Sequence, residues 1–112
     1  MTAAPDHIRI LRAAEHWARG VSKTFDAEVA DCAGSLALAT TEDGAIVLQG
    51  RNTAGHPVSI CLAHGQDGPE IHLLRTELIT ADGFAAIRKT EVQLSLPRYL
   101  RRQLAPTAEV SA

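Results

Sequence analysis

Aromatic side chains, cysteines and long apolar runs are all scarce in this chain of 112 residues. Its four aromatic residues do not cluster into a stacking platform for single-stranded nucleic acid. Its two cysteines, Cys32 and Cys61, are too few for a disulfide scaffold, so we expect a reducing, cytoplasmic environment. No apolar run approaches the ~18–20 residues that cross a bilayer, and the N-terminus has no pattern of a secretory signal. We therefore expect no association with a membrane.

Motifs that carry catalysis or bind cofactors are also missing. The sequence contains no Gly-x-Ser-x-Gly elbow, Walker loop or dinucleotide fingerprint. Cys61 and His64 look like half of a metal site, but an odd spacing on a strand places them on opposite faces. His64 and His72 are expected to face each other across the turn at 65–69. Cys61 lies within an apolar run, where burial raises the pKa of a thiol and makes it inert. We therefore expect no metal, no cofactor and no catalytic residue.

What is present is the composition of an ordinary globular protein, with 46% hydrophobic and 21% charged residues. This length predicts one domain, which we place at residues 1–106, followed by a flexible tail at 107–112. A folded chain of this size should have a radius of gyration near ~13 Å.

Two helices are predicted near the N-terminus. Apolar residues follow a helical spacing over residues 6–19, with Asp6 as the expected N-cap and Gly20 as the expected end. A second helix is predicted to begin at Ser22 and to end near Gly34, with Val21 packing as a hydrophobic staple. A strand is the alternative for this second segment, because its apolar residues also alternate.

Residues 35–96 instead alternate in the manner of strands, with turns between them. Asp43-Gly44 and Asp82-Gly83 each separate two apolar runs, which is a strong hairpin signal. Residues 69–81 fit either a helix or a strand. We favour a strand with a bulge, because the turn at Asp82-Gly83 requires a strand on both sides. Pro97 then fits the first turn of a short helix that ends before Pro106.

The sum is an α+β fold in which two N-terminal helices pack on one face of an antiparallel β-meander of about five strands, with a short C-terminal helix. The other face of the sheet is left open, which favours a partner or a homodimer there. The apolar positions on the inner side of these elements form the predicted core, which comprises Ile10, Trp17, Val21, Phe25, Val29, Leu36, Leu38, Ile46, Leu48, Val58, Ile60, Leu62, Leu94, Leu96 and Leu100.

Charge is unevenly distributed behind a net value of −2. Residues 1–23 carry four basic and two acidic groups, whereas residues 24–84 carry nine acidic and two basic groups. Residues 85–105 carry five basic groups and one acidic group. Complementary charge speeds and orients protein association, so these segments supply our candidate binding residues. They are Arg88, Lys89, Arg98, Arg101 and Arg102 on the basic side and Glu42 and Asp43 on the acidic side.

Residues 90–104 resemble the opening of ribbon-helix-helix DNA-binding proteins, in which an alternating strand enters a helix through a proline. The resemblance implies DNA contacts from the strand. Those domains have a second helix, however, whereas Pro106 and a polar tail follow here. We therefore interpret the stretch as a final strand and a helix that covers one end of the core.

These observations predict a non-enzymatic protein-binding module, such as a small adaptor, inhibitor or immunity-type protein that covers a surface of its partner. One alternative is a nucleic-acid-associated regulator that uses the basic C-terminal segment. Another is a small dimeric ligand-binding or enzymatic domain.

Overall fold

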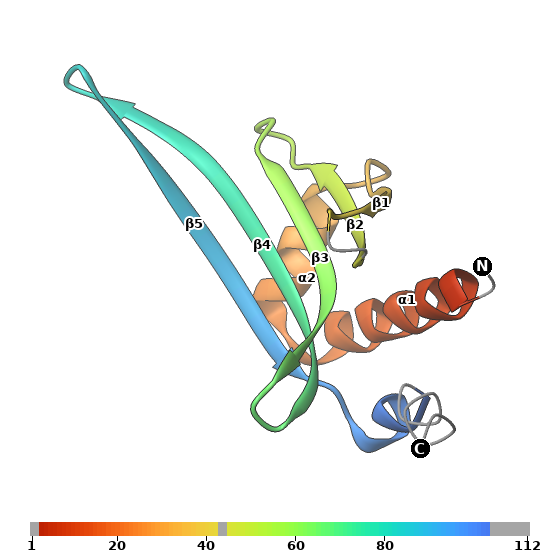
Figure 1. The fold of residues 1–112 in the computed structure, drawn as a ribbon. Helices are drawn as coiled ribbons and strands as arrows, with labels where there is room; N and C mark the ends of the chain where they lie inside the picture. Colours follow the sequence, from red (N-terminus) through yellow and green to blue (C-terminus); the bar gives the residue numbers. More distant parts are fainter. Residues whose placement is uncertain (1–2, 43–44, 104–112) are drawn as a thin grey trace.

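The computed structural model describes residues 3–42 and 45–103, and it has the predicted α+β architecture (Figure 1). Two helices are followed by five strands in the order β1-β2-β3-β4-β5, each antiparallel to the next. A short C-terminal helix covers residues 98–103. The elements are α1 (Ala3–Val21), α2 (Lys23–Asp31), β1 (Ala37–Thr40), β2 (Ile46–Arg51), β3 (Pro57–Gly65), β4 (Gly68–Ala81) and β5 (Phe84–Ser95).

Both helices form where they were expected, but their ends differ: α2 ends at Asp31 rather than near Gly34, and Val21, expected as a hydrophobic staple, ends α1 and is exposed. Helix α1 begins at Ala3, before the predicted cap Asp6, and continues through Gly20 to Val21. The second helix starts as predicted, because the Ser22 hydroxyl accepts a hydrogen bond from the Phe25 amide at 3.1 Å. Gly34 adopts a positive φ of 76° in the turn that follows α2.

Residues 69–81 form a strand, as favoured, but the predicted bulge is wrong. The register of β4 against β5 is continuous from Glu70↔Ser95 to Ala81↔Phe84. The apolar residues therefore divide between the two faces of β4, with Ile71 and Leu73 on one side and Leu74 and Leu78 on the other. The turn at Asp82-Gly83 has two positive φ values, 54° and 81°, as the tight hairpin requires.

Both N-terminal helices pack against one side of the sheet, here called the helix-side face (Figure 1). On β3 and β4 this face carries Ile60, Ile71 and Leu73, which are fully buried. The opposite side, here called the open face, carries Ser59, Cys61 and Ala63 on β3. The continuous register also brings Glu91, Gln93 and Ser95 of β5 to the open face. The open face is therefore lined by odd-numbered residues of both β3 and β5.

The core was predicted wrongly at two positions. Val21 is 58% exposed and Leu38 is 51% exposed, although both were expected to be buried. Each lies at the end of a helix or on an edge strand, where neighbours cover a side chain from fewer sides. The prediction also omitted several buried residues. They lie on α1 (Leu11, Ala14 and Ala18), on β4 (Ile71 and Leu73), on β2 (Val47) and directly after α2 (Cys32).

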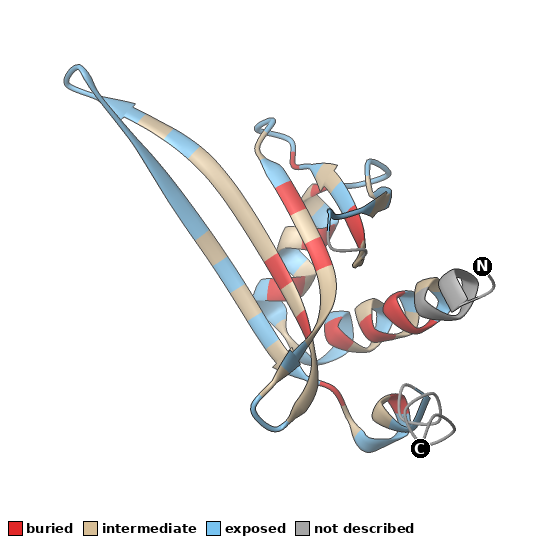
Figure 2. Ribbon diagram, in the orientation of Figure 1, coloured by how far each residue is buried: buried red, intermediate tan, exposed pale blue. Residues whose placement is uncertain are grey.

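The radius of gyration is 15.3 Å, well above the expected value, and the molecule measures 56 × 30 × 29 Å. One feature explains the elongation. Strands β4 and β5 extend far beyond the other strands as a two-stranded hairpin (Figure 1). The buried residues gather at the opposite end of these strands and under the helices (Figure 2).

Candidate interaction surface on the projecting hairpin

The projecting hairpin begins where β3 stops pairing with β4. The last pair of β3 with β4 near this end is Val58↔Arg75. From Thr76 onward β4 pairs with β5 alone, up to the turn at Asp82-Gly83 and back to Lys89. We call residues 76–89 the arm. A two-stranded ribbon without a third strand or a covering helix is marginally stable in water, so the contacts that hold the arm matter.

The arm exposes large apolar side chains on both of its faces. Leu78 and Ile87 lie directly opposite each other on the open face and are 63% and 67% exposed. Phe84 lies on the helix-side face near the tip and is 77% exposed. Three of the six exposed large apolar residues in the described part of the chain therefore lie on this one hairpin. The adjacent pair Leu78 and Ile87 forms an exposed apolar patch on the open face, and exposed apolar patches mark interaction sites in folded proteins.

A chain of ion pairs joins the arm to α2. Arg75 Nη1 lies 2.6 Å from Glu28 Oε1 on the helix, and Arg75 Nε lies 3.2 Å from Glu77 Oε2. The same Glu77 accepts a hydrogen bond at 2.9 Å from Arg88 Nη2 across the hairpin. Arg75 also donates to Thr90 Oγ1 at 3.1 Å. The root of the arm is thereby fixed in direction by side chains from α2, β4 and β5.

The pKa of the Glu77 carboxyl lies below its ordinary value. The main cause is the hydrogen bond from Arg88, and the positive charges of Arg88, Arg75 and His56 act in the same direction. His56 belongs to the β2–β3 turn, where Asn52 Oδ1 accepts a hydrogen bond at 2.9 Å from the His56 amide. The ionised carboxylate of Glu77 therefore helps to hold the arm through its ion pairs with Arg75 and Arg88.

The open face next to the arm holds the other titratable cluster. His72 lies directly opposite Cys61, and its ring nitrogens lie 2.9 Å from Glu70 Oε1 and 3.7 Å from Glu91 Oε2. Burial and the nearby Glu91 charge raise the pKa of the Cys61 thiol. A raised pKa keeps sulfur in the thiol form, which is a poor nucleophile. Within residues 3–42 and 45–103, no group of three or more His, Cys, Asp or Glu residues is arranged to hold a metal ion.

The prediction that His64 faces His72 is wrong. His64 pairs with Pro69, and His72 pairs with Cys61, so the two histidines differ by one residue in alternation and point to opposite faces. The two-residue turn pairs even-numbered residues of β3 with odd-numbered residues of β4, so an even spacing across the turn places two side chains on opposite faces.

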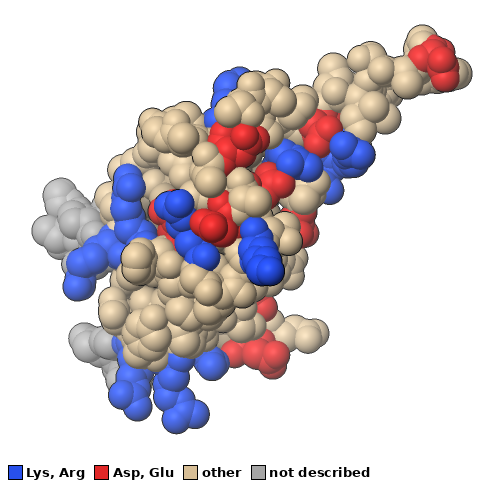
Figure 3. Space-filling view, turned by 180° about the vertical axis from the view of Figure 1, so that it is seen from behind, with Lys and Arg blue, Asp and Glu red and all other residues tan. Residues whose placement is uncertain are grey.

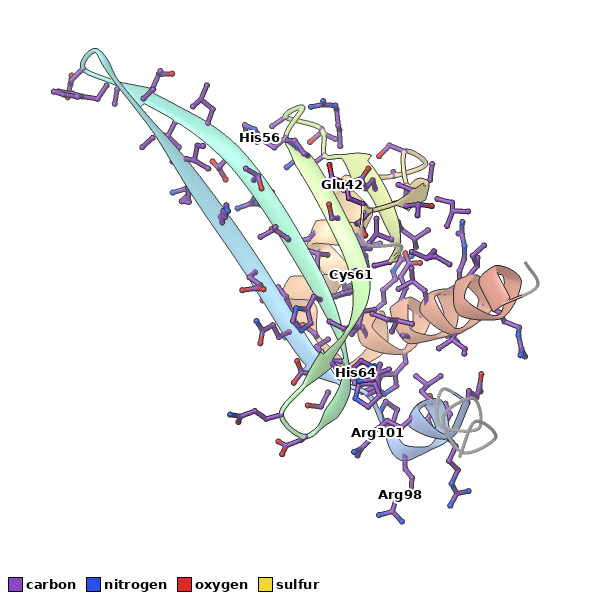
Figure 4. All side chains as sticks on the ribbon, viewed as in Figure 1. Glu42, His56, Cys61, His64, Arg98 and Arg101 are labelled. Carbon is purple, nitrogen blue, oxygen red and sulfur yellow. The ribbon has the colours of Figure 1, made fainter. Side chains whose placement is uncertain are left out.

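The five predicted basic residues form two separate groups. Arg88 and Lys89 lie on the arm, whereas Arg98, Arg101 and Arg102 lie on the helix at the other end of β5. Arg98 points away from the body of the protein (Figure 4). Arg101 instead donates to the Asp67 carbonyl oxygen at 3.1 Å and thus fastens the C-terminal helix to the β3–β4 turn. Figure 3 shows basic side chains dispersed among acidic ones over the rear of the molecule.

Of the predicted acidic pair, only Glu42 lies within the described residues, and it is far from Arg98 and Arg101 (Figure 4). Glu42 is exposed on the connection between β1 and β2, and Asp43 lies outside the described residues (Figure 4).

Sequence reasoning missed the arm itself and the ion pairs at its root. The turn at Asp82-Gly83 predicts the hairpin, but the sequence carries no signal that β3 ends before reaching its tip. The contact of Glu28 with Arg75 had no signal either, since 47 residues separate the two.

Comparisons with known proteins identify no relative. No family model matches the sequence, and neither the curated proteins nor the solved structures contain a significant match. In the part of the chain that the structure describes, no helix combines the length and the apolar character needed to cross a membrane.

Proposed function

We propose that this chain is a non-enzymatic protein-binding module that covers a surface of its partner, with the arm as its main contact element. One observation carries the proposal: Leu78 and Ile87 form an exposed apolar pair on a two-stranded ribbon beside which the described part of the chain places no other strand. Apolar side chains in this position lose contact with water only when another surface covers them.

The surroundings of this pair favour a protein partner. Lys89, which is exposed, lies on the same face, and Arg88 and Glu77 on the opposite face are already paired. Lys89 thus gives the apolar pair a charged neighbour on its own face, as at the polar rim of a protein interface. The described residues outside the arm, here called the base, supply rigidity, because the ion pairs through Arg75 orient the arm before any partner binds.

The enzymatic alternative receives no support from the described titratable residues. Burial and the nearby charge of Glu91 raise the pKa of the Cys61 thiol and so favour its protonated form, which is a poor nucleophile. The nucleic-acid alternative requires one continuous cationic surface. Its five residues lie at two ends of β5, and two of them are engaged in contacts within the chain.

Quantitative affinity capture from the native host tests the proposal. We expect the double variant Leu78→Ser/Ile87→Ser to lose specific protein partners that the unaltered chain retains. Both side chains are exposed, so circular dichroism should show an unchanged fold. The matched control is Arg98→Glu/Arg102→Glu, which alters exposed residues at the other end of β5.

Two outcomes would contradict the proposal. One is capture that survives the loss of Leu78 and Ile87 but not the reversal of Arg98 and Arg102. The other is a mobility shift of nucleic acid at low salt, where phosphate contacts are strongest, that disappears in the arginine variant.

A further inference from the structure

Among the described residues, no strand pairs with the outer edge of β5. The strand has β4 on one side, and within residues 3–42 and 45–103 no strand lies on the other (Figure 1). All residues of β5 from Phe84 to Lys89 are exposed, as are the three odd-numbered residues that follow. A strand edge of this length is a template for pairing with another strand.

The hydrogen-bond pattern shows which backbone groups this edge offers. The Leu96 amide donates to the Pro69 carbonyl oxygen at 3.2 Å, which fixes the phase of pairing between β4 and β5. In an antiparallel ladder only alternate residues bond to a given neighbour. The backbone N–H and C=O groups of the even-numbered residues of β5 therefore point toward β4. The N–H and C=O groups that point outward belong to the odd-numbered residues, Ala85, Ile87, Lys89, Glu91, Gln93 and Ser95.

We propose that two copies of this chain associate through their β5 edges, antiparallel and with a two-fold axis at Thr90. This inference rests on the proposed role of the arm as a contact element and names a second copy as its first partner. In this arrangement Ala85 of one copy lies opposite Ser95 of the other, so all six outward-facing residues of each edge are paired. The two sheets become one continuous sheet of ten strands.

Charge complementarity supports this register. With the axis at Thr90, Lys89 of each copy lies opposite Glu91 of the other on the open face. Opposite charges in directly facing positions stabilise a strand pair, and like charges destabilise it. Moving the axis by one residue places Lys89 opposite Lys89 or Glu91 opposite Glu91. The register with complete overlap is thus also the one with matched charge.

The same register covers the apolar tip of the arm. On the helix-side face, Ala86 of one copy lies opposite Leu94 of the other, and Phe84 lies at the level of Leu96. Leu94 packs against the buried core, and Leu96 belongs to it. The exposed Phe84 therefore meets the apolar end of a core rather than solvent. Leu78 and Ile87 stay on the open face and remain available to a different partner.

Light scattering and sedimentation over a concentration series test the association. We expect the unaltered chain to form a dimer. Lys89→Glu replaces two opposite-charge contacts by two like-charge contacts and should raise the dissociation constant about tenfold or more. The double variant Lys89→Glu/Glu91→Lys exchanges the charges and should restore dimerisation. Lys23→Glu, the same charge change on an exposed residue of α2, serves as the control.

Cross-linking reads the position of the axis directly. Thr90 pairs with itself as a non-hydrogen-bonded pair, whose short Cα separation suits a disulfide. In a Cys61→Ser background, Thr90→Cys should form covalent dimers on oxidation, whereas Lys89→Cys should not. A chain that stays monomeric at high micromolar concentration overturns the inference. So does a dimer that is indifferent to charge exchange, or one that cross-links through Lys89→Cys instead.

These outcomes separate the two proposals. A monomer whose partner capture still depends on Leu78 and Ile87 contradicts self-association alone. A dimer that captures nothing through those residues contradicts the proposed function alone.

Discussion

The base and the arm are built from similar strand sequences but differ in what covers them. On β4, Leu73 lies beside β3, faces the helices and is fully buried, whereas Leu78, five residues further along, lies on the open face of the arm and is 63% exposed. Both are leucines in the same regular strand. The difference shows that alternation in a sequence specifies a strand and its two faces, while neighbouring elements decide whether a face is buried.

Truncating one leucine in each region is the strongest test of this comparison. Leu73→Ala leaves a cavity in the core and should lower the free energy of unfolding by about 2–5 kcal/mol. Leu78→Ala should change it by less than ~0.5 kcal/mol, as is usual for exposed positions. Urea denaturation measures both. Equal losses would mean that the arm is packed as tightly as the base.

Removing Arg75 should disconnect the two regions. Arg75→Ala leaves the carboxylate of Glu28, whose side chain is only 12% exposed, without its ion-pair partner. We expect a loss of about 1–3 kcal/mol in stability and faster amide exchange across the arm, measured by mass spectrometry. The control is Arg88→Ala at the exposed end of the ion-pair chain, where the loss should stay below ~1 kcal/mol. Unchanged exchange in the arm after loss of Arg75 would show that the ion pairs do not hold it.

Two turn glycines offer a matched pair with a smaller effect. Gly55 in the base and Gly83 at the tip of the arm have positive φ values of 87° and 81°, and a Cβ atom at either would meet no neighbour within 4 Å. Alanine at either position should cost about 1 kcal/mol of backbone strain. We expect Gly55→Ala to lower global stability in urea and Gly83→Ala to reduce chiefly the protection of arm amides. The reverse pattern would refute the division into base and arm.

Acid should loosen the arm before it affects the base. Because the pKa of Glu77 is lowered in the folded protein, its carboxylate stabilises the folded arm at pH values above the ordinary pKa of a glutamate, which is about 4.3. That contribution is lost as the pH falls toward the folded pKa. We expect NMR signals of the Ile87 methyl groups to move below about pH 4 while those of Ile60 stay in place. Glu77→Gln should abolish this difference, and a shift that persists in the variant would assign it to another group.

The candidate surface was only partly predictable. Arg88 and Lys89 were chosen for their charge, and both lie on the arm. Their neighbours Leu78 and Ile87 were assigned to a hairpin without any expectation of exposure. The sequence shows that these residues are apolar, but it does not show that β3 ends before reaching them.

Local sequence specifies the cap of α2 at Ser22, the hairpin at Asp82-Gly83 and the alternation of β5, because these follow from hydrogen bonds and backbone preferences within a few residues. Which apolar side chains are buried, and which charged groups form ion pairs, depends on contacts between elements that are distant in the sequence. The physical reason is strand length: β3 has nine residues and β4 has fourteen, so β3 cannot pair with the whole of β4. The unmatched residues of β4 extend into solvent with β5, and contacts such as Glu28 with Arg75 exist only once α2 has packed at the root of that extension.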